Sequence, residues 1–192
     1  LEAGVPSTPF SSHIRNTLEY HKAILGLGAP VDAIGYQGHY HGARVTMAEV
    51  DEHIEAFRPL GKPVHITEFT ATPANQNDDG QTWGHKAAFF VNAYTVLFSK
   101  PFVEQITAWH LIDNRSGLFD SRGEETEILA AMRKLLTKDW WTVWRGGLVQ
   151  GKAAFRGFFG EYEIRAPGYR PQKADLLAPG EKAITLRRLD SK

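Results

Sequence analysis

The chain of 192 residues contains no cysteine, which excludes disulfide bridges, thiolate metal ligands and thiol catalysis. Acidic and basic residues balance at 22 each, so no excess of charge favours nucleic acid or an anionic membrane as a partner. No apolar run approaches the roughly 20 residues of a membrane span, and the start LEAGVPSTPF lacks the basic and apolar regions of a signal peptide. We therefore expect a neutral partner, neither nucleic acid nor membrane, and any targeting segment outside this chain.

Helical and strand-like patterns alternate over the first two thirds of the chain. Amphipathic patterns predict helices over residues 11–27, 83–98 and 124–138, and a further helix that opens at a capping box formed by Thr46 and Glu49. Short apolar runs predict strands over 31–39, up to Glu68, and over 105–112. Helices that alternate with buried strands indicate a parallel α/β sheet.

A complete (β/α)8 barrel typically needs about 250 residues, and the residues before Trp140 provide little more than half of that length. From Trp140 on, short β-type runs separated by glycine and proline predict a small antiparallel extension of two to four strands. We predict an α/β fold: the C-terminal part of a (β/α)8 TIM barrel over residues 1–139, with about three strand-helix units, followed by a β-rich extension over 140–192. The missing N-terminal half of the barrel is then an expected partner.

Polar side chains follow the C-terminal ends of the three predicted strands. Gln37 and His39 end the first strand, Glu68 ends the second, and Trp109 and Asp113 lie at the end of the third. Catalytic groups of parallel barrels lie at this end of the strands. An amide, an imidazole, a carboxylate and an indole suit a polyhydroxylated ligand. Two structural interpretations stay open, namely Glu68 as a helix cap or ion-pair partner and Asp113 as a turn residue.

Strict alternation along the strands predicts which side chains share a face. Val64, Ile66 and Glu68 are expected on one face of the second strand. His65 and His110 are expected to point the other way, toward the helices, and to have structural roles.

Four segments carry a resemblance to a known family. VDAIGYQGH, GKPVHITEF, ITAWHLID and GLFD occur in the order and at the spacing of the retaining endo-β-1,4-xylanases of glycoside hydrolase family 10. The resemblance covers roughly residues 11 to 137, and the tail, with its segments KLLTKDWWTVWRGGL and FRGFFGEYEI, resembles a C-terminal extension in one branch of these enzymes. It implies a secreted or extracellular protein that acts on xylan or xylo-oligosaccharides without a cofactor or a metal.

The resemblance also implies roles for individual residues. Glu68 is the expected nucleophile and His39 its hydrogen-bond partner, so these two form the expected catalytic pair. The expected substrate contacts come from the ends of the first and third strands: Gln37 for sugar hydroxyls, Trp109 as a platform at the cleavage subsite, and His41 and Asp113.

The chain departs from the family pattern at several places. Thr70 stands where many members have Asp, His110 stands where Gly often follows the Trp, and the loop after Asp113 lacks a second Trp commonly seen there. The acid/base glutamate of the family belongs to an Asn-Glu pair, and no such pair occurs in this sequence. We therefore expect this chain alone to have little activity on natural xylan.

Two other functions stay open. His39 and His41 form an H-x-H pair which, with Asp113 as proton acceptor, would suit a metal-dependent barrel hydrolase. A half-barrel with a β extension would also suit a non-catalytic carbohydrate-binding or assembly module, whose open sheet edges favour association. Zinc bound by both histidines would favour the first, and glycan binding that survives loss of Glu68 would favour the second.

Overall fold

A computed structural model describes residues 2–3, 12–41, 45–72 and 82–189. The chain divides into two compact units, residues 1–135 and 136–192. This division lies just before the boundary predicted after residue 139. None of the helices in the described ranges is long and apolar enough to cross a membrane.

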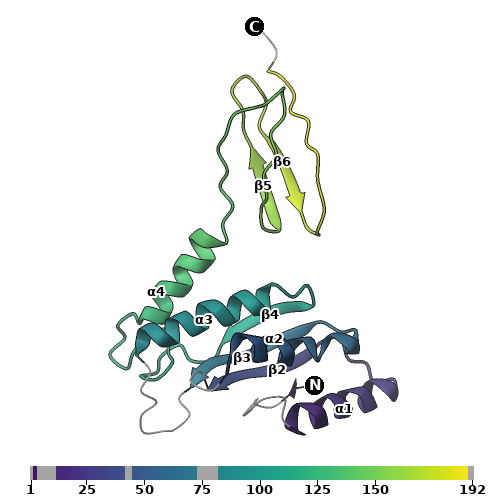
Figure 1. Ribbon diagram of the computed structural model, residues 1–192, viewed down its shortest axis with the longest axis vertical. Helices are drawn as coiled ribbons and strands as arrows, with labels where there is room; N and C mark the ends of the chain where they lie inside the picture. Colours follow the sequence, from purple (N-terminus) through teal and green to yellow (C-terminus); the bar gives the residue numbers. More distant parts are fainter. Residues whose placement is uncertain (1, 4–11, 42–44, 73–81, 190–192) are drawn as a thin grey trace. The chain divides into compact units, whose positions relative to one another are not determined.

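Strands and helices alternate through the first unit (Figure 1). The elements are β1 (Glu2–Ala3), α1 (Ser12–Gly26), β2 (Ile34–His41), α2 (Met47–Glu55), a 3-10 helix (Arg58–Leu60), β3 (Val64–Thr72), α3 (Trp83–Phe98), β4 (Val103–Ala108) and α4 (Glu127–Lys134). A short π helix (Leu135–Asp139) spans the boundary to the second unit. The four strands form one parallel sheet in the order β1-β2-β3-β4. The sequence predicted three of them, because the two residues of β1 are too few to produce a periodic pattern.

Local hydrogen bonds explain where two helices begin. The predicted capping box is confirmed: the Glu49 N–H donates to Thr46 Oγ1 at 3.2 Å, and the Thr46 N–H donates to Glu49 Oε2 at 2.6 Å. The backbone bond from Thr46 holds the pKa of Glu49 below its ordinary value. Thr82 caps α3 by accepting the His85 N–H at 3.3 Å. Most of the polar loop predicted over residues 72–80 lies outside the described residues.

Helices α2 and α3 cover one face of the sheet (Figure 1). α1 lies on the same side, because the ring of His21 contacts Phe57, which in turn contacts Tyr36 of β2. The apolar side chains of this face are fully or almost fully buried, and they include Ile34, Tyr36, Tyr40, Val50, Ile54, Phe57, Val64, Ile66, Phe69, Phe90 and Leu97. Each of these large side chains contributes about 1.5–3 kcal/mol of burial free energy, so this layer holds the sheet in place.

A bulge in β3 breaks the expected alternation. Tyr36 of β2 lies opposite Ile66 of β3, but the next residue, Gln37, lies opposite Glu68. Thr67 is therefore an extra residue on β3, and an extra residue reverses the faces of everything that follows it.

The reversal corrects one prediction. Val64 and Ile66 are fully buried on the helix-covered face, and so is Phe69. Glu68 therefore lies on the opposite, open face of the sheet, and its expected common face with Val64 and Ile66 is wrong. Strict alternation fails here because the period of two holds only for a strand without a bulge.

The expected direction of His65 is wrong for a related reason. Its neighbours Val64 and Ile66 occupy the helix-covered face, so the half-buried His65 lies on the open face. There its Nε2 lies 3.5 Å from a carboxylate oxygen of Glu104.

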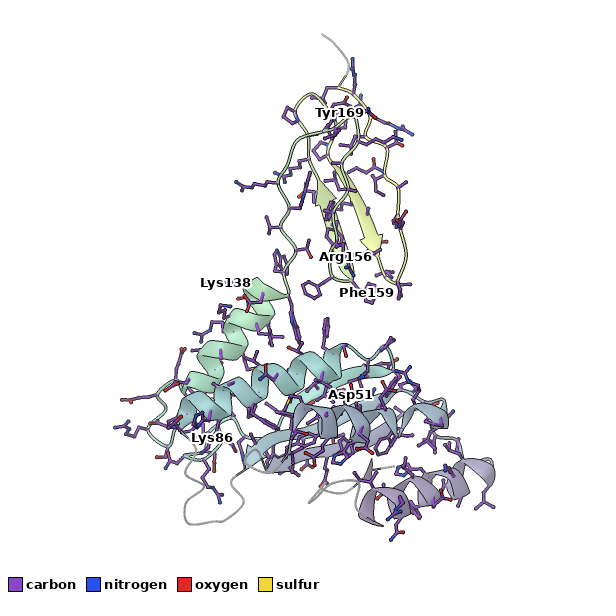
Figure 2. All side chains as sticks on the ribbon, viewed as in Figure 1. Asp51, Lys86, Lys138, Arg156, Phe159 and Tyr169 are labelled. Atoms are coloured by element: carbon purple, nitrogen blue, oxygen red, sulfur yellow. The ribbon has the colours of Figure 1, made fainter. Side chains whose placement is uncertain are left out.

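The second unit contains an antiparallel hairpin of β5 (Gly160–Ile164) and β6 (Gln172–Leu176). Trp144 stacks on Phe155 with ring centroids 5.4 Å apart. Many large apolar side chains of the second unit are exposed, among them Phe159, which Figure 2 labels. Two strands are present in the described part of this unit, the lower end of the predicted range.

Candidate active site

The C-terminal ends of β2, β3 and β4 bring the predicted site residues together. Gln37 lies directly opposite Glu68 in the β2–β3 pairing. The backbone N–H of Trp109 donates to the carbonyl of Phe69 at 2.9 Å, which fixes the end of β4 beside β3. An amide, a carboxylate and an indole therefore come from three neighbouring strands to one edge of the sheet.

His39 and Glu68 form the central pair of the site. His39 Nε2 lies 2.8 Å from Glu68 Oε2, and the two side chains are 16% and 19% exposed. An ionised carboxylate only accepts hydrogen bonds, so Nε2 of His39 is the donor whenever Glu68 is ionised. Partial burial strengthens such a charge-assisted bond, while part of the Glu68 side chain stays accessible. The bulge at Thr67 makes the contact possible, because it turns Glu68 to the face of His39.

Trp109 stands beside this pair. Its ring centroid lies 5.8 Å from that of His39 at an interplanar angle of 82°, and half of the side chain is exposed. A T-shaped contact of this kind leaves part of the indole surface open. A flat apolar surface beside a carboxylate is an arrangement that can receive a sugar ring.

Asp113 lies in a turn after β4. Its Oδ1 accepts the backbone N–H groups of Arg115 at 2.7 Å and Ser116 at 2.9 Å. Partial burial alone would raise the pKa of Asp113, but these two bonds and the nearby His110 and Arg115 outweigh it and lower the pKa. This geometry is that of the turn residue that the sequence left open, and a substrate contact by Asp113 stays a prediction.

His41 ends β2, but its side chain is not among the described ones. Its substrate contact and its part in an H-x-H metal pair therefore stay predictions. Within the described ranges, no three His, Asp or Glu side chains gather closely enough to hold a metal ion.

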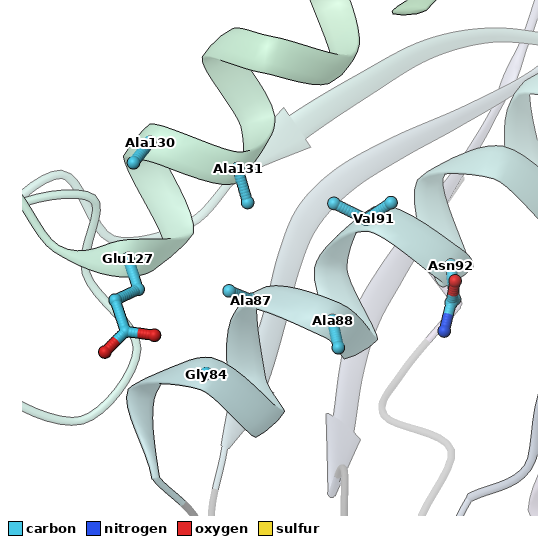
Figure 3. A pocket seen from close by; sticks show the side chains of 8 residues that line it. All are labelled: Gly84, Ala87, Ala88, Val91, Asn92, Glu127, Ala130 and Ala131. Atoms are coloured by element: carbon cyan, nitrogen blue, oxygen red, sulfur yellow. The ribbon is translucent and has the colours of Figure 1, made fainter.

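A groove of about 530 Å³ lies elsewhere, between α3 and α4 (Figure 3). Small side chains dominate its lining, which consists of Gly84, Ala87, Ala88, Val91, Asn92, Glu127, Ala130 and Ala131. None of the predicted site residues lines it. The lining of this groove offers too few polar groups for a catalytic site. We therefore place the candidate site at the strand ends instead.

Sequence reasoning missed Ser116, which is 2% exposed and accepts a hydrogen bond from Thr70 at 2.7 Å. Ser116 lies in a loop, where no helical or strand periodicity indicates which side chains are buried. The only available signal was that Thr70 and His110, its two partners, are positions at which the chain departs from the family pattern.

A parallel sheet with helices over one face, and with a histidine and a glutamate paired at the strand ends, agrees with the predicted part of a (β/α)8 barrel. The family model of glycosyl hydrolase family 10 matches residues 11–133, and the chain belongs to this family. The predicted family is thereby confirmed.

One curated relative and two solved structures illustrate what this chain is similar to. Endo-1,4-beta-xylanase B of Paenibacillus barcinonensis is 26% identical over 135 residues, which cover 65% of this chain and 40% of the relative. Native xylanase 10B of Thermotoga maritima matches with a TM-score of 0.60 at 19% identity, covering 70% of this chain and 45% of that one. Xylanase 10B of Thermotoga petrophila, solved in complex with xylobiose, matches with the same TM-score, identity and coverage.

These structural matches confirm the predicted fold class, the C-terminal part of a (β/α)8 barrel. The chain spans less than half the length of the relatives it matches.

Proposed function

We propose that this chain supplies the nucleophile side of the active site of a retaining glycoside hydrolase that cleaves β-1,4-xylan. The observation that carries the proposal is the pair of His39 and Glu68, 2.8 Å apart at the ends of neighbouring parallel strands. Membership of glycosyl hydrolase family 10 supports the same reaction class.

Glu68 attacks the anomeric carbon of the bound sugar. One carboxylate oxygen forms a bond to that carbon while the bond from the carbon to the leaving oxygen breaks, which gives a glycosyl ester. The Nε2–H of His39 donates to Glu68 Oε2 and so fixes the orientation of the carboxylate. His39 is a positioning residue in this step, since it acts through Glu68.

The reaction needs a second carboxyl group about 5 to 5.5 Å from the nucleophile, which protonates the leaving oxygen and later activates water. We propose that this group comes from barrel strands outside this sequence. Two observations support this: the sequence has no Asn-Glu pair, and the chain spans 45% of a structurally similar xylanase. The chain by itself is then unable to assist the departure of an unactivated sugar.

Gln37 and Trp109 bind the sugar beside the nucleophile. The Gln37 amide lies in register with Glu68 and offers a donor and an acceptor to neighbouring hydroxyls. The half-exposed indole of Trp109 offers an apolar surface to the sugar ring. Xylan is the proposed substrate because the relatives of this chain are named as xylanases and one was solved with xylobiose. A secreted location belongs to the same proposal, and fractionation of cells from culture medium tests it.

Covalent trapping tests the role of Glu68. The chain is incubated with a 2-fluoro-xylobioside that carries an activated leaving group, both alone and with a separately produced upstream half of a family 10 barrel. Because an activated leaving group needs little acid assistance, the probe separates Glu68 from the second carboxyl group. We expect peptide mass spectrometry to find a fluoroxylobiosyl adduct on Glu68.

The variants Glu68→Gln and Glu104→Gln provide the control. Glu104 is an exposed carboxylate on the neighbouring strand β4, so its loss should leave the adduct unchanged. An adduct on another residue, or one that persists in Glu68→Gln, would contradict the assignment. Xylo-oligosaccharide binding without an adduct, unchanged in Glu68→Gln, would favour the non-catalytic binding module.

A further inference from the structure

We propose that a hydrogen-bonded relay of Thr70, Ser116 and His110 positions Trp109 beside the Glu68–His39 pair. The effect of this relay on sugar binding rests on the function proposed above, whereas the effect of the relay on the position of Trp109 does not. Thr70 and His110 are two positions at which this chain departs from the family pattern, and both side chains meet at the hydroxyl of Ser116.

The relay starts on the nucleophile strand. Thr70 follows Glu68 by two residues on β3, and it is fully buried. Its Oγ1 donates to Ser116 Oγ at 2.7 Å, and Ser116 is 2% exposed. A hydroxyl pair of this kind, closed off from water, is costly to break because each group would lose its partner.

The relay ends on the residue next to Trp109. Ser116 Oγ lies 3.2 Å from His110 Nδ1. The single hydroxyl proton of Ser116 is not used toward Thr70, so in this proposal Ser116 donates it to Nδ1 of His110, and that nitrogen then carries no proton. The loop around Ser116 supports this geometry, because Asp113 accepts the Ser116 N–H at 2.9 Å.

Trp109 is therefore held on two sides. Its own N–H donates to the Phe69 carbonyl at 2.9 Å, and its neighbour His110 is tied through Ser116 to Thr70. Both attachments lead back to β3, the strand that carries Glu68. The relay thus couples the position of the indole to that of the nucleophile across two strands.

Fluorine NMR of the chain labelled with 5-fluorotryptophan tests this relay. The chain has five tryptophans, and the Trp109→Phe variant assigns the resonance of interest. We expect Thr70→Val, which keeps the shape and removes the hydroxyl, and Ser116→Ala each to shift or broaden the Trp109 resonance. Thr70→Ser restores the hydroxyl and should restore the wild-type resonance.

Thr126→Val is the matched control. Thr126 is also buried, and its hydroxyl donates to the carbonyls of Gly117 and Leu118 in the same loop. It reaches His110 only through the backbone, where the Leu118 N–H donates to the His110 carbonyl at 3.3 Å. Its removal keeps the side chains of Thr70, Ser116 and His110, so it should change the Trp109 resonance clearly less than Thr70→Val or Ser116→Ala does. Nitrogen NMR of His110 adds a direct signature. In the wild type the Nδ1 resonance should have the chemical shift of an unprotonated ring nitrogen, and in Ser116→Ala this chemical shift should change.

Titration with xylotriose separates this proposal from the proposed function. We expect Thr70→Val to raise the Kd for xylotriose about five- to tenfold, the loss expected for one buried hydrogen bond. If xylotriose leaves the wild-type Trp109 resonance unchanged while Thr70→Val still alters it, the relay stands and the proposed substrate fails.

The relay itself is overturned if Thr70→Val and Ser116→Ala leave the Trp109 resonance at its wild-type position. It is also overturned if Thr126→Val changes that resonance as much as they do, or if Nδ1 of His110 is protonated. Should Thr70→Val fail to fold, Ser116→Ala together with Thr70→Ser decides the question.

Discussion

The two faces of the parallel sheet hold different kinds of residue. On the face covered by the helices, Tyr36, Ile66 and Phe69 are fully buried. On the open face, His39 and Glu68 form a half-buried polar pair. Glu68 and Phe69 are neighbours in sequence but belong to different faces. Glu68 therefore serves the proposed reaction, while Phe69 stabilises the fold. Substitutions at these positions can therefore test each face independently.

The largest expected effect is on the open face. Glu68→Gln removes the nucleophile but keeps the shape of the side chain, so we expect the trapping rate with the 2-fluoro-xylobioside to fall by at least about 10⁴-fold. The free energy of unfolding should change by less than about 1.5 kcal/mol, because the amide oxygen still accepts from His39. Mass spectrometry and urea denaturation measure the two quantities. A large loss of stability would show that the two faces are not separable.

Phe69→Ala tests the covered face. The Phe69 ring lies 4.9 Å from that of Phe90 and 5.0 Å from that of Tyr94, and it is fully buried. Removing it leaves a cavity, so the free energy of unfolding should fall by about 3–5 kcal/mol. Phe69→Leu is the control and should lose less, because it fills most of the cavity. Denaturant unfolding measures these losses in free energy, provided that the m-value is the same in all variants. Equal losses in Phe69→Ala and Phe69→Leu would contradict the cavity explanation.

His39→Ala should have an intermediate effect. It removes the hydrogen bond to the Glu68 carboxylate, and bonds to charged groups contribute about 1.5–3 kcal/mol, which corresponds to a fall in trapping rate of about 10- to 100-fold. The rate should fall far less than in Glu68→Gln, since the attacking atom remains. Equal losses in the two variants would mean that His39 does more than position the carboxylate.

The smallest effect concerns an ion cluster at the other end of the strands. The guanidinium of Arg58 donates two hydrogen bonds to the Glu55 carboxylate, at 2.5 and 2.7 Å. Lys100 Nζ lies 2.9 Å from the same carboxylate. Lys100 also pairs with Asp51, which Figure 2 labels on α2. The hydrogen bonds from Arg58 and then Lys100 lower the pKa of Glu55 from 4.5 to about 2. The expected stabilisation is the smallest of the four effects, because these side chains are partly exposed and solvent screens their charges.

The pH dependence has a definite sign. A carboxylate with a lowered pKa stabilises the fold above its unfolded pKa, so this contribution is full above about pH 4.5 and disappears as the pH falls toward 2. Glu55→Gln should therefore flatten the stability curve between these values and leave the trapping of Glu68 unchanged. A curve identical to that of the wild type would contradict the role of this cluster.

Most elements could be predicted because their signals are local. The capping box of Thr46 and Glu49 marks the start of α2, and the apolar stripe of residues 83–98 marks α3. β1 could not be predicted, because a strand of two residues is defined only by its pairing with β2. The pair of His39 and Glu68 was anticipated from residue types at strand ends and from the family resemblance, and the structure places the two side chains 2.8 Å apart.

The sequence by itself determined the alternation of strands and helices, the family and the residue types available at the strand ends, because periodicity, capping residues and motifs are properties of neighbouring positions. Only the tertiary structure decided the face of Glu68 and His65 and the meeting of Thr70, Ser116 and His110. A bulge arises from the register between two strands, and a hydroxyl relay arises where a distant loop folds back on a strand. Both depend on contacts between residues far apart in the chain, which no local pattern encodes.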